Sequence, residues 1–535
     1  MSFVLNDSQQ LSLFDSLGFM RERKLRILER SWAKPFSDHI FTKIDESIFA
    51  PLFSTSTNSR PNAPINVIVG ALILKELTGM SDDEVMDACE LDLRFQYALH
   101  TTSFEVQPIS DRTFSRFRAR CAAYELTTGT DLIHECIVKL ADDIRKYMEI
   151  DSTVKRMDSM MVESNIRKMG RLELLHTCLS NLVKEIDREG RKKMIKGLEH
   201  YADPNDRNRV IYHGKDIPYA DRLQQVIDDA VRLLPLCEEE YGNTTDYQLL
   251  LRAINEQTKD AGWKGGGRVP KEKGDGIDSS VLQNPSDPDA TYRVKAGKEH
   301  HGYAANIVEA VDTTGSVIVD YQYDANTRSD SDFAKEAIAS MKRTRETTAL
   351  ITDGAYSGHE VQRLADKKNI GVLTTGLSGV APKDILAEFT FSGDGKKLRT
   401  CANGNRPKSQ SYIRQSDQIR ASFHRTQCES CPFLEQCAPD LRKRTAVVMV
   451  SARAKERALE ARDHKTDPIW PLIRRIRNGA ETIPSILRRK YHVDKIPSRG
   501  KIRSRQFFGF KIGALNFTKL WRYQQKLEYC RAFQT

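Results

Sequence analysis

The sequence predicts an α/β protein: an all-helical N-terminal region, then a mixed sheet with a helical insertion and a small cysteine-rich insertion. Three observations lead to this prediction. Apolar residues recur at helical spacing through the first third of the chain, short apolar runs typical of strands follow residue 154, and four cysteines lie between residues 401 and 437. With 535 residues, the chain is too long for one ordinary core, so about three to four domains are expected.

The N-terminal helical domain is expected to span residues 1–145, and capping residues mark its helix ends. Pro64 precedes an apolar run with helical periodicity, and Gly79 ends that run. Ser81 and Glu84 have the spacing of a capping box, in which each side chain bonds the backbone N–H of the other residue. The sequence therefore predicts one helix that ends at Gly79 and another that begins after Ser81.

A further helix of this region carries Arg112, Arg116 and Arg120 at every fourth position, which places them on one face. Phe114 and Phe117 lie on another face. A basic face backed by an apolar face suits a helix that packs on a bundle and presents its arginines to DNA. The alternative is a surface helix whose arginines are simply solvated. The three arginines are therefore candidate DNA-binding residues.

The order of elements after residue 154 is that of a mixed sheet interrupted by helices. A strand at Lys155–Val162 precedes a helical insertion at about 165–285, and the segment Gly262–Pro288 has the composition of a linker. A hairpin and two further strands follow, separated by helices. The expected strands are Tyr303–Val311, Ser316–Tyr323, Ala349–Asp353 and Gly371–Thr375. We expect one α/β domain over 146–375, completed by 451–535 after a cysteine-rich insertion at 376–450.

The positive charge of the chain is concentrated near its C-terminus. The net charge is +10. Between Arg474 and Arg522 there are 14 lysines and arginines against two acids, whereas the remaining positions carry 69 bases and 71 acids. A localised basic segment is typical of proteins that bind a polyanion, although a solvated helix face has the same composition. Aromatic residues among these cations indicate that the segment also packs: Phe507, Phe508, Phe510, Phe517 and Trp521.

Neither a membrane protein nor a secreted protein is indicated. No apolar run approaches the roughly 20 residues of a membrane-spanning helix. The first residues lack the basic region and apolar stretch of a secretory signal. We therefore expect a cytoplasmic protein without a membrane partner, in which the scattered cysteines stay reduced.

Two aspartates stand where a sheet would hold a carboxylate in a fixed position. Asp158 lies within an otherwise apolar strand, where an unbalanced charge is costly unless a metal ion or a cation pairs with it. Asp353 ends an apolar strand and is followed by a glycine turn. Carboxylates that converge from separate elements are ligands that Mg²⁺ prefers. Both are therefore candidate metal ligands, although each alone would be an ordinary strand residue.

Three sequence blocks resemble the catalytic blocks of bacterial insertion-sequence transposases of the DDE type: Asp158–Arg167, Gly302–Glu309 and Thr352–Tyr356. Arg60–Pro64 and the helices after it resemble the N-terminal domain of that family, and the similarity extends to Trp521. The resemblance implies a ribonuclease-H-like catalytic domain in which Asp158 and Asp353 are the first two acids of a three-carboxylate site. It also implies Mg²⁺ or Mn²⁺ as cofactor, double-stranded DNA as partner, and a homodimer or higher oligomer on DNA.

The third acid is assigned from a signature of that family: Tyr, two residues, Arg, three residues, Glu, six residues, Lys. The same spacing here gives Arg474, Arg477, Glu481 and Arg488, so arginine replaces both the tyrosine and the lysine. Glu481 is therefore the expected third metal ligand, and Arg477 and Arg488 are expected to bind DNA phosphate. The alternative is a structural i, i+4 pair between Arg477 and Glu481. Rival third acids are Glu456, Glu460 and Asp463.

Four of the ten cysteines lie close together in sequence: Cys401, Cys428, Cys431 and Cys437. Four thiolates suit a structural Zn²⁺ ion, and the Cys-x-x-Cys pair is typical of such sites. The spacing to the other two cysteines is looser, so His424 is an alternative ligand to Cys401. An iron–sulfur cluster and a set of free thiols are further alternatives. The family often carries a similar cysteine group between its second and third acids, which favours zinc.

The function expected from these observations is metal-dependent cleavage of DNA at the ends of a mobile element, followed by strand transfer into target DNA. Arg499, Lys501 and Arg503 of the basic segment are expected to bind DNA of any sequence. The alternatives are a ribonuclease-H-like nuclease without strand transfer and a transposase-derived DNA-binding protein that no longer cuts. In a bacterial cell such a protein is expected on the nucleoid.

Overall fold

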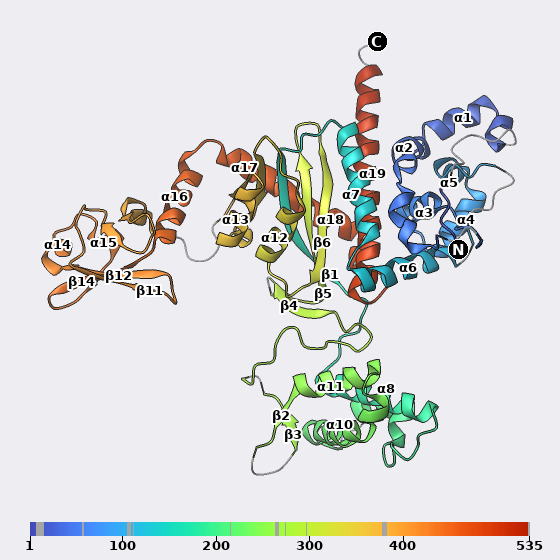
Figure 1. Ribbon diagram of the computed structural model, residues 1–535, viewed down its shortest axis with the longest axis horizontal. Coiled ribbons are helices and arrows are strands. Elements are labelled where there is room, and N and C mark those ends of the chain that lie inside the picture. Colours follow the sequence, from blue (N-terminus) through green and yellow to red (C-terminus); the bar gives the residue numbers. More distant parts are fainter. Residues whose placement is uncertain are drawn as a thin grey trace. The chain divides into compact units, whose positions relative to one another are not determined.

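The computed structural model describes residues 1–535 except 7–14, 56–57, 104–108, 111, 214–215, 263–266, 273, 296, 377–381 and 533–535. Its contacts divide the chain into two compact units. The first comprises Met1–Ser152, Ser159–Ser329 and Ile483–Thr535, and the second comprises Thr153–Asp158 and Asp330–Thr482. The fold is mixed α/β with a helical N-terminal region (Figure 1), which confirms the fold class predicted from the sequence.

The N-terminal part of the first unit is helical. Its α-helices are α1 (Glu22–Glu29), α2 (Ala33–His39), α3 (Ile65–Thr78), α4 (Asp82–Leu91), α5 (Leu93–Ala98), α6 (Thr113–Thr128) and α7 (Leu132–Tyr147). Helix α3 ends at Gly79, whose left-handed backbone (φ 75°) closes the helix. Helix α4 begins with the capping box of Ser81 and Glu84. Both helix boundaries predicted from the sequence are therefore confirmed.

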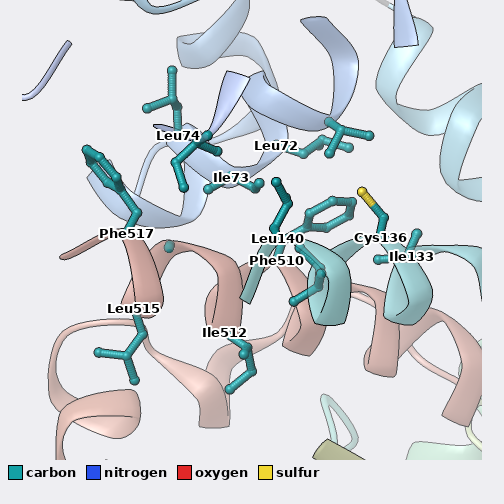
Figure 2. Packing of buried hydrophobic residues seen from close by; sticks show 14 of the residues in the cluster. Leu72, Ile73, Leu74, Ile133, Cys136, Leu140, Phe510, Ile512, Leu515 and Phe517 are labelled. Carbon is teal, nitrogen blue, oxygen red and sulfur yellow. The ribbon is translucent and has the colours of Figure 1, made fainter. Parts of the chain in front are cut away.

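The core of the first unit surrounds α19 (Lys501–Ala532), the helix that carries the aromatic residues of the basic segment. Figure 2 shows α19 packed against α3 and α7 through Leu72, Ile73, Leu74, Ile133, Cys136, Leu140, Phe510 and Phe517. Ile512 and Leu515 point to the opposite side of α19. There the Asn516 amide bonds the backbone N–H and carbonyl of Ile318. Helix α19 is therefore buried on two sides, as its aromatic residues indicate.

Much of the positive charge on α19 is neutralised within the first unit. Lys501 Nζ lies 3.0 Å from Asp324 Oδ1, and Arg505 Nε lies 2.9 Å from Asp131 Oδ2. Lys511 pairs with Glu76 and Lys519 with Glu309. These four acids are all at least 177 residues away in sequence. The charge imbalance along the sequence is therefore in part a set of internal ion pairs.

The helical insertion has its own hydrophobic core, made chiefly by α8 (Arg171–Arg188), α10 (Tyr219–Tyr241) and α11 (Thr245–Gln257). It also contains α9 (Asp206–Asn208) and the antiparallel strands β2 (Thr258–Asp260) and β3 (Arg268–Pro270). Leu282 is buried in this core, and fully buried Asp287 accepts a hydrogen bond from Tyr303. The prediction of a linker is therefore wrong for this part of Gly262–Pro288, because these residues are anchored by packing and hydrogen bonds.

The strand order of the main sheet is β4-β5-β1-β7-β8, and β6 also pairs with β5. The strands are β1 (Val154–Glu163), β4 (Thr291–Lys295), β5 (Lys298–Val311), β6 (Ser316–Ala325), β7 (Thr348–Thr352) and β8 (Ile370–Thr374). Strands β5 and β6 form the predicted hairpin, whose turn is held by Asp312 Oδ1 bonding the N–H groups of Thr314 and Gly315. Strands β1, β7 and β8 run parallel. Parallel strands bring their carboxyl ends to one edge, which is where Asp353 follows β7.

The rest of the second unit consists of helices beside the parallel strands and a small β-rich part. The helices are α12 (Asp330–Ser340), α13 (His359–Lys367), α16 (Ala452–Thr466), α17 (Trp470–Asn478) and, continuing into the first unit, α18 (Thr482–Arg489). The β-rich part contains β9 (Thr390–Phe391), β10 (Leu398–Thr400), β11 (Ser409–Ile413), β12 (Gln418–His424), β13 (Asp440–Leu441), β14 (Thr445–Val450), α14 (Arg425–Glu429) and α15 (Leu434–Cys437). Among the described helices of either unit, none is both long and apolar enough to cross a membrane.

Candidate active site

Three carboxylates of the second unit contact one guanidinium group, that of Arg477. Its Nη2 atom lies 3.3 Å from Oδ2 of Asp158 and 4.0 Å from Oδ2 of Asp353. Its Nη1 atom lies 3.1 Å from Oε1 of Glu481. The structure thus brings the three acids named from the sequence, which lie on separate elements, together around a single cation.

The two aspartates are placed by the parallel register of β1 and β7. Arg156 of β1 pairs with Ile351 of β7, and two residues further along these segments stand Asp158 and Asp353. Asp353 Oδ1 also accepts a hydrogen bond of 2.7 Å from the N–H of Ala355, which caps the turn η6 (Gly354–Tyr356). The Asp158 side chain is 19 % exposed and that of Asp353 is 52 % exposed. Asp158 is therefore the carboxylate that most needs a nearby positive charge.

Helix α17 holds Arg477 over the strands through its apolar face. Trp470 and Ile473 are buried against Ile351 of β7. Arg156 donates a hydrogen bond of 2.8 Å from Nη1 to the carbonyl of Ile476, which fixes the end of the helix to β1. A Cβ atom on Gly479 would lie 1.9 Å from that Nη1. Glycine at this position therefore leaves room for the Arg156 side chain that holds the last turn of α17.

The Arg477 side chain is 10 % exposed, so its charge is poorly solvated and depends on the three carboxylates. Its Nε atom is buried, and no described residue accepts a hydrogen bond from it. Among the described residues there is also no group of three or more His, Cys, Asp or Glu arranged to hold a metal ion. The oxygen donor set suits Mg²⁺ or Mn²⁺, and in this arrangement the guanidinium supplies the positive charge.

Glu481 lies in the short turn η8 (Gly479–Glu481), where α17 ends and α18 begins. Its side chain is 66 % exposed, so its pair with Arg477 is well solvated. This geometry is consistent with a structural i, i+4 pair between Arg477 and Glu481, and equally with Glu481 as the third acid of the site. The contact itself therefore does not distinguish the two roles of Glu481.

Glu460, the rival acid on α16, has other contacts. Its Oε1 accepts a 2.5 Å hydrogen bond from Thr374, the last residue of β8, and lies 3.9 Å from Nε2 of His464. No described contact links it to Arg477. The other two rivals, Glu456 and Asp463, are exposed on the same helix. Of the four candidates for the third acid, Glu481 is the one in contact with Arg477.

Most of the expected DNA-binding residues near the C-terminus already have bonding partners within the protein. Arg488 Nη2 donates to the carbonyl of Met161 at 2.8 Å, and Arg499 Nε donates to a backbone carbonyl at 2.8 Å. Lys501 is paired with Asp324. Arg503 is exposed, and none of the described carboxylates lies within 4.0 Å of its guanidinium. Within the part of the chain that the structure describes, Arg499 and Arg503 are therefore the members of this set whose charge no carboxylate balances, whereas Arg488 pairs with Asp494 and Lys501 with Asp324.

The expected basic face of α6 is also partly exposed. Phe114 and Phe117 are buried, which confirms the apolar face. Arg112 is exposed at the start of the helix, and the other two arginines of the set, Arg116 and Arg120, line a cavity of about 470 Å³. Arg60, which is not among the predicted DNA-binding residues, lines the same cavity. Because Arg60 lies in a loop, no helical spacing in the sequence groups it with the arginines of α6.

The four clustered cysteines line one small cavity in the β-rich part of the second unit: Cys401, Cys428, Cys431 and Cys437. They are free thiols of intermediate exposure. Burial, with the nearby thiol of Cys428, raises the pKa of Cys437 to about 11. His424 is exposed and does not line the cavity. The thiols are gathered, but within the described residues they do not form a metal-binding group.

Two family models match parts of the chain. The model described as "Transposase domain (DUF772)" matches residues 27–120, most of the N-terminal helical region. The model described as "Transposase DDE domain" matches residues 400–521, which contain the four clustered cysteines, Arg477, Glu481 and much of α19. Asp158 and Asp353 lie outside both matched segments. Neither a comparison with curated proteins nor one with solved structures finds a match.

Proposed function

The chain belongs to the insertion-sequence transposases of the DDE type, and we propose that it cuts DNA at the ends of a mobile element and joins those ends to target DNA. Membership of this family implies DNA as the partner. The observation that carries the proposal is the convergence of Asp158, Asp353 and Glu481 on the guanidinium of Arg477. Three acids on separate elements meet at a point where their negative charges need a cation, which in this structure is the Arg477 guanidinium.

Asp158, Asp353 and Glu481 would hold Mg²⁺ or Mn²⁺. When bound, such ions activate the attacking oxygen and stabilise the leaving oxygen of a phosphodiester. Asp353 keeps one oxygen on the N–H of Ala355, which leaves the other oxygen directed at the site. Asp158 is held by the strand on both sides of it, so its position does not depend on a flexible loop. The positions of the two aspartates are therefore set by β1 and by the capped turn after β7, before any ion binds.

Arg477 would act as the counterion of this site in the absence of metal. Its guanidinium contacts the same carboxylate oxygens that a divalent cation would need. Binding of a cation there requires the guanidinium to move away, because two positive groups cannot share those oxygens at close range. A guanidinium that leaves carboxylates is well suited to donate two hydrogen bonds to a DNA phosphate. Arg477 would thus couple the metal site to the substrate.

The same proposal includes a structural Zn²⁺ ion and an oligomer on DNA. The clustered thiols support a structural Zn²⁺ ion because all four line one cavity, although their side chains would have to draw closer together. A dimer or higher oligomer on DNA is expected because two ends of an element have to be joined. The regulator that no longer cuts is disfavoured, since a pure DNA binder gains nothing from three acids that repel phosphate.

The proposal is tested by incubating the protein with a plasmid that carries its gene and the flanking DNA. Cleavage should require Mg²⁺ or Mn²⁺, and Asp158→Asn or Asp353→Asn should lower the rate by more than the roughly 100-fold typical of losing an outer-shell group. Glu460→Gln is the matched control and should leave cleavage near the wild-type rate. Joined products would identify strand transfer, whereas cut DNA alone would favour the nuclease. Undiminished cleavage by Asp158→Asn would refute the proposed site.

A further inference from the structure

The first unit contains a large cavity, of about 930 Å³, on which basic residues from distant parts of the chain converge. One wall comes from α3, α4 and α6, and the other from residues 490–511. Its volume lies within the range of about 300–1,000 Å³ that is usual for ligand sites. None of its lining residues belongs to the three-carboxylate site, so its occupant has to be argued separately.

The floor of the cavity is a network of buried ion pairs. Lys75, whose side chain is 8 % exposed, lies 2.9 Å from Asp82, and Asp82 also pairs with Arg118. Glu76 pairs with Lys511 of α19. Three cations therefore face two acids in a poorly solvated place, which leaves the floor with an excess of positive charge. Groups held this way are fixed in position, because breaking one buried pair strands its partner.

The rim adds cations that have no acid to balance them. Lys490, Lys495 and Arg503 line the cavity and are exposed. Among the described residues, none of the three has a carboxylate within 4.0 Å. The third acid of the lining, Glu84, is already bonded to the backbone N–H of Ser81 in the capping box of α4. Six lysines and arginines thus line the cavity against three acids, and most of the excess positive charge lies at the mouth.

The electrostatics of Lys490 agree with that imbalance. Although Lys490 as a whole residue is exposed, its ammonium is partly desolvated, and this, with a smaller contribution from the charge of Arg522, lowers the pKa of Lys490 below its ordinary value. The Lys490 ammonium therefore lacks the negative neighbour that would offset its desolvation. An anion bound in the cavity would supply one.

The lining also indicates which part of a nucleic acid would fit. Aromatic side chains that bind bases have to present a free ring face. Tyr491 and Phe507 line the cavity but are only 1 % and 7 % exposed, and Lys75 and Arg118 already lie over the ring of Phe507, 4.8 Å and 5.0 Å from its centroid. The accessible groups at the mouth are cations without a stacking surface. Such a lining matches a phosphate backbone rather than bases.

We propose that this cavity, with Lys490, Lys495 and Arg503 at its rim, binds the phosphate backbone of double-stranded DNA independently of base sequence. The proposal rests on the proposed function only in taking DNA as the ligand. It differs from the expected set Arg499, Lys501 and Arg503, of which Arg503 alone lines the cavity. The proposal also assigns DNA contacts to Lys490 and Lys495, which lie outside that set.

The test is the salt dependence of DNA binding by the full chain, measured with a duplex of arbitrary sequence in EDTA. Each phosphate neutralised contributes about 0.9 to the slope of log K against log salt concentration. The double variant Lys495→Ala/Arg503→Ala should therefore reduce the slope by about 1.8. The matched control is Lys192→Ala/Lys193→Ala, which removes two exposed cations from the helical insertion. Thermal unfolding of both variants should match wild type, because all four side chains are exposed.

Two results would overturn the proposal. One is an unchanged slope for Lys495→Ala/Arg503→Ala, or an equal reduction by the control pair. The other is binding of a free nucleoside monophosphate that depends on Lys495 and Arg503 while DNA binding does not, since the cavity would then take a small anion. Because EDTA removes divalent cations, Asp158→Asn should bind DNA as wild type does in this assay. Failure here therefore leaves the cleavage test of the carboxylate site unaffected.

Discussion

Replacing Arg477 with alanine separates the two roles proposed for this residue, counterion of the carboxylates and ligand of DNA phosphate. In the absence of metal the variant should be less stable than wild type, because Asp158 loses its contact at 3.3 Å. In the presence of Mn²⁺ the difference should shrink, because a divalent cation then replaces the guanidinium. Both expectations follow from the three ion pairs of Arg477.

The magnitude follows from distance and exposure. Two unit charges about 4 Å apart interact by about 4 kcal/mol at an effective dielectric constant of 20. Asp353 and Glu481 are 52 % and 66 % exposed, so solvent screens most of their share. Removing one partner of a fully buried pair costs about 3–5 kcal/mol, and the 19 % exposure of Asp158 lowers that to roughly 2 kcal/mol. If cation binding no longer has to displace the guanidinium, the same energy corresponds to about 30-fold tighter binding of Mn²⁺.

The assay is chemical unfolding followed by circular dichroism, in EDTA and in saturating Mn²⁺. Arg477→Ala should unfold at lower denaturant concentration than wild type in EDTA and gain more stability from Mn²⁺, as expected for a ligand that binds the folded state more tightly. Arg475→Ala is the matched control, since Arg475 is exposed on the same helix. Arg477→Lys keeps the positive charge, so its stability in EDTA and its gain in stability from Mn²⁺ should lie between those of wild type and Arg477→Ala. Equal Mn²⁺-induced stabilisation of wild type and Arg477→Ala would show that the guanidinium does not compete with metal.

Two further predictions concern the cysteines and the half-buried His134. Purified protein should contain about one Zn²⁺ per chain, and Cys428→Ser should release it; metal-free but folded wild type would exclude zinc. His134 Nε2 lies 2.8 Å from Asp320 Oδ1. Desolvation is the largest single influence on the pKa of His134 and lowers it, but the hydrogen bond to Asp320 and the charge of Asp320 together raise that pKa above its ordinary value. The pair should therefore stabilise the fold below about pH 6.5 and lose that contribution as pH rises through the higher folded-state pKa, so urea unfolding of His134→Gln should lack this pH dependence.

Local signals in the sequence were sufficient for much of the fold. The capping box at Ser81, the end of α3 at Gly79 and the hairpin of β5 and β6 each depend on residues a few positions apart. The position of Asp353 directly after β7 is of the same kind, because an apolar run followed by an acid and a glycine marks a strand end. These features were predictable since their causes lie within one short segment.

The features that the sequence did not indicate arise from contacts between distant residues. Lys75 and Glu76 interrupt an otherwise apolar helix, and the partner of Glu76, Lys511, lies 435 residues away. The role of Arg477 as a shared counterion likewise depends on the parallel register of β1 with β7, which no local pattern specifies. Family spacing named Glu481, but its contact with Arg477 fits both of the roles considered for it.

Direct measurement of Mn²⁺ binding by electron paramagnetic resonance tests, without DNA or turnover, whether Asp158, Asp353 and Glu481 bind one set of divalent cations. Wild type and Glu460→Gln should bind Mn²⁺ with the same affinity. Asp158→Asn and Asp353→Asn should each weaken binding by more than about tenfold, because each loses a ligand without a change in volume. Mn²⁺ binding that survives both substitutions unchanged would show that the two aspartates are not metal ligands.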